Sequence, residues 1–249
     1  MAKVIALAGK GGTGKTTIAA LLVRLIKEKQ LGSVLAIDAD PNSNLGEVLG
    51  AKTGDDIGKI LDNITSNPDK IPAAMTKARF IQHQVQSAIQ EEEGFDLLSM
   101  GKPEGAGCYC YVNNVLRGVM LKLIADYDYI VIDNEAGLEH LSRRTSRYAD
   151  ILIAVSDASK IGLKSAKRII GLVKELKFEI KKGFLLINRS NNIEKDRLAE
   201  IDLDFLGNLP FDPQIEELSL DGKSIFELKS DSSLFKALNS LGEKIWKHN

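Results

Sequence analysis

The chain has 249 residues with a formal net charge of −1, and hydrophobic residues make up 44% of it. This length and composition fit one globular α/β domain over residues 1–249. The balanced charge, the lack of an apolar run of about 18 residues and a start that leads directly into a strand predict a cytoplasmic protein without a signal peptide, binding neither nucleic acid nor a membrane.

The first predicted element is a buried strand at residues 4–8, which leads into a glycine-rich loop from Gly9 to Thr17. The loop matches the phosphate-binding pattern G-x-x-x-x-G-K-[ST], and a helical pattern begins at Thr16. Glycines let the backbone point its N–H groups at an anion, and the helix dipole adds positive potential. We expect the Lys15 ammonium to reach the β- and γ-phosphates of ATP and the Thr16 hydroxyl to ligate Mg²⁺. The candidate residues for binding ATP or ADP in this loop are Gly11, Gly12, Thr13, Gly14, Lys15, Thr16 and Thr17.

The helix after the loop is predicted to bury one apolar stripe and to carry Arg24 on its outer face. Residues 33–38 then predict a second buried strand, which ends at Asp38. Pro41 breaks this strand into a loop, so Asp38 and Asp40 are both candidates to approach the phosphates. The alternative is an acidic loop or a helix cap.

Residues 51–93 are less informative: residues 55–63 and 69–93 have helical patterns in patches, Pro68 and Pro72 act as breakers, and the three glutamates at 91–93 are predicted to be a solvated helix end. Residues 95–100 predict a short strand. A loop with three glycines follows and ends in a Cys-Tyr-Cys sequence, where a helix over residues 112–124 begins. Thiols at a helix N-terminus are acidified by the dipole and become better metal ligands.

The two thiols of this loop, Cys108 and Cys110, are the only cysteines in the chain. A four-sulfur site for Zn²⁺ or Ni²⁺ needs twice that number, and His83, His140 and His248 have no ligand spacing to them. A complete sulfur site therefore requires two chains, each contributing one Cys-x-Cys. The alternatives are a pair of small packing residues or a redox-active pair.

Three further buried strands are predicted in the second half of the chain. Residues 127–133 form the first, and its terminal acid, Asp133, is a candidate for the Mg²⁺ shell, with an ordinary core strand as the alternative. Residues 149–156 form the second, and residues 183–188 form the last clear core strand.

Two helices in this half carry surface predictions. One has a basic face, formed by Lys164, Lys167 and Arg168, which is either solvated or a nucleic-acid patch. The C-terminal helix is amphipathic and is expected to pack on the sheet rather than to bind a membrane.

An extra lysine in the glycine-rich loop indicates a particular group of phosphate-binding proteins. With Lys10 the loop reads G-K-G-G-x-G-K-T-T, which resembles the deviant Walker A group of P-loop ATPases, including MinD, ParA and the nitrogenase iron protein. The resemblance implies a mostly parallel central sheet with helices on both faces and Mg²⁺-dependent hydrolysis of ATP in a homodimer. Besides Lys15, it implies three catalytic residues: Lys10 reaches the partner's nucleotide, Asp38 supports the Mg²⁺ shell, and Asp40 orients or deprotonates the attacking water. The alternative for Lys10 is a solvated loop charge.

The same resemblance implies three nucleotide contacts outside the loop. The backbone N–H of Gly137 would sense the γ-phosphate, Asn188 would pair with adenine, and Pro210 would flank the base. A turn-capping role is the alternative for Asn188. The dipeptide Asn134-Glu135 departs from the pattern of the group, which leaves a direct role for these two side chains open.

The Cys-Tyr-Cys sequence, followed by Tyr-Val-Asn-Asn, resembles the CooC-type ATPases (CooC and AcsF) of CO dehydrogenase and acetyl-CoA synthase maturation. That resemblance implies a nickel metallochaperone whose dimer holds Ni²⁺ or Zn²⁺ between Cys108 and Cys110 of both subunits, with one of those two enzymes as its client. Two other functions share the nucleotide chemistry: a MinD/ParA-like positioning or partition switch, and an iron–sulfur cluster carrier.

Overall fold

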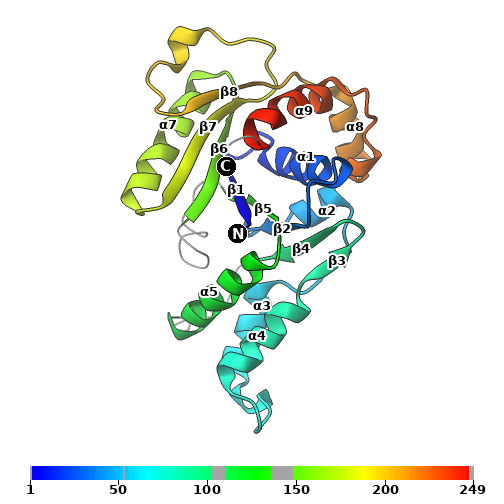
Figure 1. The fold of residues 1–249 in the computed structure, drawn as a ribbon, viewed down its shortest axis with the longest axis vertical. Coiled ribbons are helices and arrows are strands. Elements are labelled where there is room, and N and C mark those ends of the chain that lie inside the picture. Colours follow the sequence, from blue (N-terminus) through cyan, green and yellow to red (C-terminus); the bar gives the residue numbers. More distant parts are fainter. Residues whose placement is uncertain (1, 53, 102–109, 136–147, 247–249) are drawn as a thin grey trace.

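A twisted sheet forms the centre of the computed structural model, which describes residues 2–52, 54–101, 110–135 and 148–246 (Figure 1). In this part of the chain the sheet has eight strands in the order β3-β4-β2-β5-β1-β6-β7-β8, and only the β3–β4 pair is antiparallel. The strands are β1 (Lys3–Ala8), β2 (Val34–Asp38), β3 (Gln90–Glu92), β4 (Phe95–Ser99), β5 (Tyr129–Asp133), β6 (Tyr148–Ser156), β7 (Glu179–Ile187) and β8 (Asp204–Asn208).

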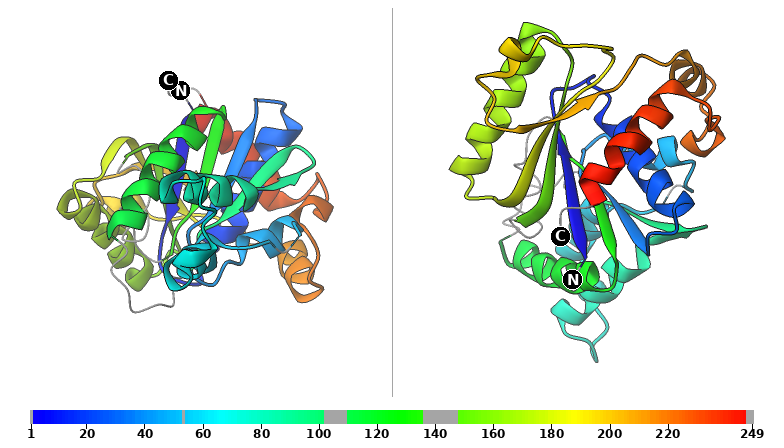
Figure 2. Two further views of the ribbon diagram at one scale, coloured as in Figure 1. Left: turned by 90° about the horizontal axis from the view of Figure 1, so that it is seen from below. Right: turned by 45° about the horizontal axis from the view of Figure 1, so that its top comes forward.

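Helices cover both faces of this sheet, and each face has its own apolar core. One core lies under α1 (Lys15–Glu28), α2 (Leu45–Leu49) and α9 (Ser233–Trp246). The other lies under α3 (Ile57–Ser66), α4 (Lys77–Ser87), α5 (Cys110–Ala125) and α7 (Lys160–Glu175). In Figures 1 and 2, α7 and the pair α1 and α9 lie on opposite sides of the strands. The predicted α/β fold with a mostly parallel sheet is therefore confirmed.

Short elements complete the chain: the helix α8 (Pro213–Leu220) and the 3-10 turns η1 (Pro68–Lys70), η2 (Lys195–Leu198) and η3 (Ile225–Glu227). None of the described helices is long and apolar enough to cross a bilayer. The C-terminal helix α9 packs as predicted, since Leu234, Leu238 and Ile245 are buried against the sheet.

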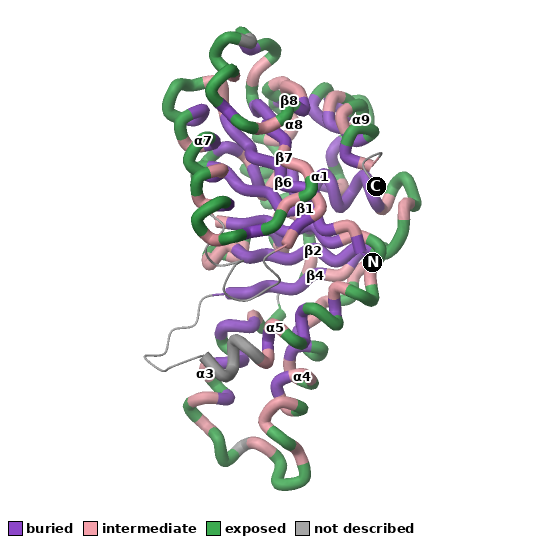
Figure 3. Tube along the Cα trace, turned by 60° about the vertical axis from the view of Figure 1, so that its left-hand side comes forward, coloured by how far each residue is buried: buried purple, intermediate pink, exposed green. Residues whose placement is uncertain are grey.

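The register of the central strands brings two acids together. Asp133 at the end of β5 is paired with Leu7 of β1 on one side and with Asp38 of β2 on the other. These strands are buried on both faces (Figure 3), as parallel strands under two helical layers must be. Because ligands of open α/β sheets bind at the carboxyl ends of strands, this register places both acids beside the loop that follows β1.

The prediction for residues 69–93 was correct in part, because a helix does follow the predicted break at Pro72. Pro72 and the capping hydroxyl of Thr76, which accepts a hydrogen bond from the Arg79 backbone N–H at 3.3 Å, delay the helix, so α4 covers only residues 77–87. The glutamates at 91–93 do not end a helix, because residues 90–92 form the edge strand β3, which turns back through Gly94 at φ 84° to pair with β4. Acidic side chains on an edge strand discourage pairing with another chain.

One strand was not predicted, and one expectation from the sequence was wrong. Residues 183–187 lie in β7, the last strand with a clear apolar run, but β8 adds an edge strand beyond it with a register shift between Leu185 and Leu186. The sequence of β8 lacks an apolar run, and its first two residues, Asp204 and Phe205, are exposed. Arg24 is not on an outer face. It is 3% exposed, and α9 and η3 cover it.

Candidate nucleotide-binding site

The glycine-rich loop follows β1 and contacts the end of β6 and the residue after β7. A Cβ at Gly9 would lie 2.2 Å from the Val155 carbonyl oxygen of β6, so only glycine permits this close approach. Gly14 begins α1 at φ 87°, and a Cβ there would lie 2.5 Å from the Asn188 Nδ2 atom. The turn therefore presents its backbone and the N-terminus of α1 to the same space, as phosphate binding requires.

Lys15 is largely buried at 7% exposure, and its ammonium donates one long hydrogen bond of 3.4 Å to the Lys10 carbonyl oxygen. That carbonyl also accepts hydrogen bonds from the Thr13 backbone N–H and hydroxyl. The Lys10 side chain itself is exposed and makes no ion pair among the described residues. Lys15 thus has donor capacity left for an anion, and Lys10 points its charge outward.

Thr16 and Asp133 form the polar end of the site. The Thr16 hydroxyl donates a 2.6 Å hydrogen bond to Asp133 Oδ2, while Asp133 Oδ1 is buried and has no hydrogen-bond partner. Burial raises the pKa of Asp133 to about 6, although the Thr16 hydroxyl and the Lys15 charge oppose the shift. A buried carboxylate oxygen without a partner beside a threonine hydroxyl fits the oxygen ligands that Mg²⁺ prefers.

Asp38 is fully buried and connects the strand to the loop after it. Its two carboxylate oxygens accept hydrogen bonds from the backbone N–H groups of Asp40 at 3.1 Å and Leu45 at 2.8 Å. Burial raises the pKa of Asp38 to about 7, and the nearby Asp133 adds to the increase. Asp38 therefore fixes the position of the loop that carries Asp40, and its hydrogen bond to Leu45 at the start of α2 is of the helix-cap kind that the sequence left open.

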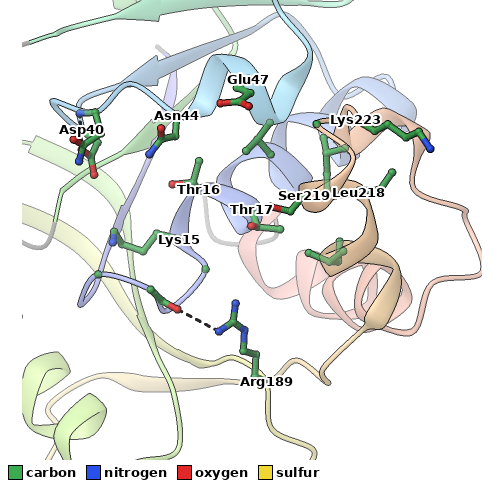
Figure 4. Close-up of a pocket in the computed structure, with 18 residues that line it drawn as sticks. Lys15, Thr16, Thr17, Asp40, Asn44, Glu47, Arg189, Leu218, Ser219 and Lys223 are labelled. Carbon is green, nitrogen blue, oxygen red and sulfur yellow. Dashed lines mark hydrogen bonds between the residues drawn. The ribbon is translucent and has the colours of Figure 1, made fainter.

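A cavity of about 500 Å³ lies over the glycine-rich loop (Figure 4). Asp40 lines it from the β2 side, and its Oδ1 atom accepts hydrogen bonds from the Asn42 backbone and side chain. Asn44 and Glu47 line the same wall, and Ser219 and Lys223 line the opposite wall. Sequence reasoning missed these last four residues, because short polar helices and turns carry no pattern that points to a site.

A second cavity of about 370 Å³ adjoins the first and includes Asn188, Pro210 and Phe211. The two cavities share Gly14, Thr17, Arg189, Ile215 and Ser219. Asn188 is 5% exposed and its Nδ2 donates a 2.8 Å hydrogen bond to the Thr13 carbonyl, while its Oδ1 accepts one from the Arg189 backbone N–H. One N–H and one lone pair of the amide remain for a base, so the adenine contact stays a prediction that this geometry permits.

Arg189 was missed by sequence reasoning, although it directly follows Asn188. Its backbone is left-handed at φ 56°, which is uncommon for a residue other than glycine and typical of functional sites. Its guanidinium donates a 3.5 Å hydrogen bond to the Gly12 carbonyl, drawn as a dashed line in Figure 4. The pKa of Asp157, at the end of β6, is lowered mainly by hydrogen bonding to Ser159 and further by the charges of Lys10 and Arg189.

The structure does not describe every residue that was singled out in the sequence. Cys108 and Gly137 lie outside the described residues, as does His140. Cys110 is the first residue of α5, as expected for a thiol near a helix start, but its side chain is not described. Asn134 is buried and donates a 2.8 Å hydrogen bond to the Leu7 carbonyl, which ties β5 to β1. The described part of the chain contains no cluster of three His, Cys, Asp or Glu side chains that could hold a metal ion.

The fold and this site define a P-loop nucleotide-binding protein. The chain belongs to the CobQ/CobB/MinD/ParA nucleotide binding domain family, whose model matches residues 4–225.

Individual proteins of known sequence or structure also match most of the chain. An uncharacterized ATP-binding protein of Methanocaldococcus jannaschii is 40% identical over 97% of this chain and 98% of its own length. The carbon monoxide dehydrogenase accessory protein CooC of Rhodospirillum rubrum is 30% identical over 90% of this chain and 89% of its own. The structure of the septum site-determining protein MinD of Pyrococcus horikoshii, complexed with Mg-ADP, aligns with a TM-score of 0.72 at 25% identity over 99% of this chain and 97% of that one.

Proposed function

We propose that this chain is a Mg²⁺-dependent ATPase that works as a nickel metallochaperone in the maturation of CO dehydrogenase or acetyl-CoA synthase. ATP binding closes a homodimer in which two Cys-x-Cys sequences meet around one metal ion, and hydrolysis opens the dimer and releases the ion. The observation that carries this proposal is the 30% identity to a CO dehydrogenase accessory protein over 90% of the chain, combined with a Cys-x-Cys in the sequence whose second cysteine begins α5.

The nucleotide half of the proposal rests on the two joined cavities. The phosphates lie over the loop, where Lys15 and the N-terminus of α1 neutralise their charge. Mg²⁺, when bound at Thr16 and Asp133 with Asp38 behind them, neutralises charge on the phosphate oxygens. Asp40 lines the phosphate cavity, from where its carboxylate orients the attacking water.

The base and the partner subunit complete the nucleotide site. The adenine ring lies in the second cavity beside Asn188 and Pro210. Lys10 reaches the nucleotide of the partner subunit, in keeping with its exposed side chain next to the phosphate cavity. The Gly137 backbone N–H, outside the described residues, contacts the γ-phosphate. Since Lys10 needs a partner, hydrolysis depends on the dimer.

The metal-binding part of the proposal rests on the number of cysteines in the chain and on their position in the sequence. Two cysteines per chain supply half of a tetrahedral sulfur site, and thiolates bind both Ni²⁺ and Zn²⁺. Because α5 begins at Cys110, the helix dipole favours the thiolate form. The ion is cargo rather than a resident cofactor, since opening of the dimer would halve its ligand set.

Native mass spectrometry with nickel titration tests the metal half. Wild-type protein with a non-hydrolysable ATP analogue should hold one Ni²⁺ per dimer. Cys108→Ser and Cys110→Ser should lose the ion and keep the nucleotide, whereas Tyr109→Phe, a matched control between them, should keep both. Lys10→Ala should bind ATP without dimerising. A single subunit that binds nickel at full strength without ATP would refute the proposal.

A second function is favoured by a different observation. MinD structures align along nearly the whole chain, and the MinD of Thermotoga maritima is 25% identical over 97% of it. A MinD/ParA-like positioning or partition switch would use the same nucleotide site. ATP-dependent co-sedimentation with anionic liposomes or with DNA would support this switch, and would replace the metallochaperone if the cysteine variants behaved like wild type.

An iron–sulfur carrier is the third possibility, since four thiolates at an interface also hold a [4Fe–4S] cluster. Anaerobic purification separates it from the nickel site. A broad visible absorption band with stoichiometric iron and sulfide would assign a cluster, and its absence in protein that binds nickel would assign the single ion.

A further inference from the structure

The outer side of α7 holds positive charge that the nucleotide site does not use. A hollow of about 780 Å³ lies between α7 and the segment around η2, and we call it the α7 groove. Its charged lining consists of the cations Lys160, Lys164, Lys167, Arg168 and Arg197 and the acids Asp196 and Glu200. Five cations against two acids leave a formal charge of +3 in a chain whose net charge is −1.

Most of this charge is not neutralised by the protein. Among the described residues, the one ion pair in the groove joins Lys167 Nζ to Glu200 Oε2 at 2.9 Å, and both side chains are more than half exposed. An exposed pair of this kind contributes little to stability. A carboxylate from another molecule can therefore replace Glu200 on Lys167 at little cost, and Glu200 marks where that carboxylate would lie.

The bottom of the groove is aliphatic. Leu163 of α7 and Ile201 beyond η2 are nearly buried there, and Ile161, on the same helix, is 65% exposed. Cations around an aliphatic floor match a segment that has both carboxylates and apolar side chains. A phosphodiester backbone offers no apolar side chains, and the two acids of the groove would repel it.

We propose that the α7 groove is a docking surface for an acidic, amphipathic helix of a partner protein. The cations at 160, 164, 167 and 168 follow helical spacing along about 12 Å of α7, at 1.5 Å per residue. Carboxylates on successive turns of a second helix match this stripe, and its apolar side chains cover Leu163 and Ile201.

The groove also lies near the nucleotide. Helix α7 starts four residues after β6 ends at Ser156, and β6 contacts the phosphate-binding loop where Val155 meets Gly9. A docked helix would thus lie close to the loop whose state depends on ATP. This inference does not depend on the identity of the client enzyme, and it concerns a different surface from the metal site proposed above.

Fluorescence anisotropy tests the proposal with a labelled peptide of glutamate, leucine and alanine that has its glutamates at helical spacing. The variant Lys160→Glu/Lys164→Glu should weaken binding at least tenfold. It should fold normally, since a glutamate at 160, the first residue of α7, is favoured by the helix dipole, and a glutamate at 164 lies one turn before Arg168 at the favourable i,i+4 spacing. The control Lys174→Glu/Lys177→Glu makes the same change of charge outside the groove and should change binding less than twofold.

Further measurements with the same groove and peptide sharpen the result. Glu200→Gln should strengthen peptide binding several-fold, because it removes the internal competitor. The same peptide with glutamine in place of glutamate should bind at least tenfold more weakly. Equal loss in the groove and control variants, no measurable peptide binding, or tighter groove-dependent binding of duplex DNA would each overturn the proposal. Retained ATP binding in every variant separates these outcomes from any failure of the metal hypothesis.

Discussion

The Thr16 hydroxyl donates its hydrogen bond to one oxygen of Asp133 and leaves the other oxygen of that carboxylate buried and unpaired. The pair connects the first turn of α1 to the end of β5, and it exists because β5 is the direct neighbour of β1 in the sheet. A cation bound to the free oxygen would neutralise the buried carboxylate and so stabilise this arrangement.

Removing the Thr16 hydroxyl should weaken Mg²⁺-dependent nucleotide binding. Thr16→Ala should raise the Kd for Mg-ATP at least tenfold, or about 1.4 kcal/mol, while binding of ATP in EDTA should change little. Thr16→Ser keeps the hydroxyl and is the matched control. Isothermal titration with and without Mg²⁺ measures both, and an equal loss in the two conditions would argue against a metal role.

The acids Asp38 and Asp133 should make stability depend on pH. Burial raises their pKa values to about 7 and about 6, above the unfolded value near 3.8, so the folded state binds more protons between those limits. Stability without Mg²⁺ should therefore fall as pH rises from about 4 to about 7 and then level off. Mg²⁺ should reverse this loss, because it binds the deprotonated acids.

Thermal melting across this pH range, in EDTA and in Mg²⁺, measures the effect. Asp133→Asn should reduce the slope between about pH 4 and about 6, and Asp38→Asn should reduce it over the whole range from about 4 to about 7 and remove it between about 6 and about 7. A melting temperature that instead rose with pH in EDTA would contradict the assigned direction of the pKa shifts.

The Asn188 amide should support the loop as well as the base. Asn188→Ala leaves the Thr13 carbonyl without its donor and should cost about 1–3 kcal/mol of unfolding free energy. Asn188→Asp keeps the oxygen and loses the donor, so it should also reduce the preference for ATP over GTP. Urea unfolding and competition between labelled ATP and GTP separate the two effects. Unchanged preference in both variants would leave Asn188 with a purely structural role.

Arg189 combines an unfavourable backbone with a useful side chain. Arg189→Gly should keep or raise stability by up to about 1 kcal/mol, because glycine adopts φ 56° without strain. Arg189→Ala should keep the strain. Both variants lose the guanidinium between the two cavities and should weaken nucleotide binding to the same extent. If only the alanine variant bound less tightly, the side chain would not be the cause.

Arg24 should be a major source of stability. Its guanidinium donates hydrogen bonds to the carbonyls of Ile225 and Leu228 and lies 4.4 Å from the centre of the Phe235 ring. Arg24→Met should cost about 3 kcal/mol, since it leaves two buried carbonyls without donors. Lys27→Met, one turn further along α1, is the control and should cost less than about 1 kcal/mol by urea unfolding.

The parts of this fold that the sequence predicts are those with a strong local pattern. Continuous apolar runs gave the strands that contain Val4, Val34 and Ile130, and the glycine pattern placed the loop that Gly14 ends. The edge strands β3 and β8 have no such run, so only pairing with a neighbour defines them.

The same contrast applies to the site. Asp133 was found because it ends a readable strand, and Asn188, which follows one, was found through the family resemblance. Arg189 needed the observed backbone angle, and Ser219 and Lys223 come close to the loop only through tertiary packing. The helical periodicity of α1 places Arg24 on the polar face, but it cannot show that α9 and η3 pack over this face.

The family model ends at residue 225, yet two of the groups that contact Arg24, at Leu228 and Phe235, come after it. A shortened chain that stopped at the end of the match would leave a guanidinium facing open water on the helix that carries the phosphate loop. Residues 226–246 are therefore part of the nucleotide domain's own framework rather than an appendage, and a functional fragment must retain them.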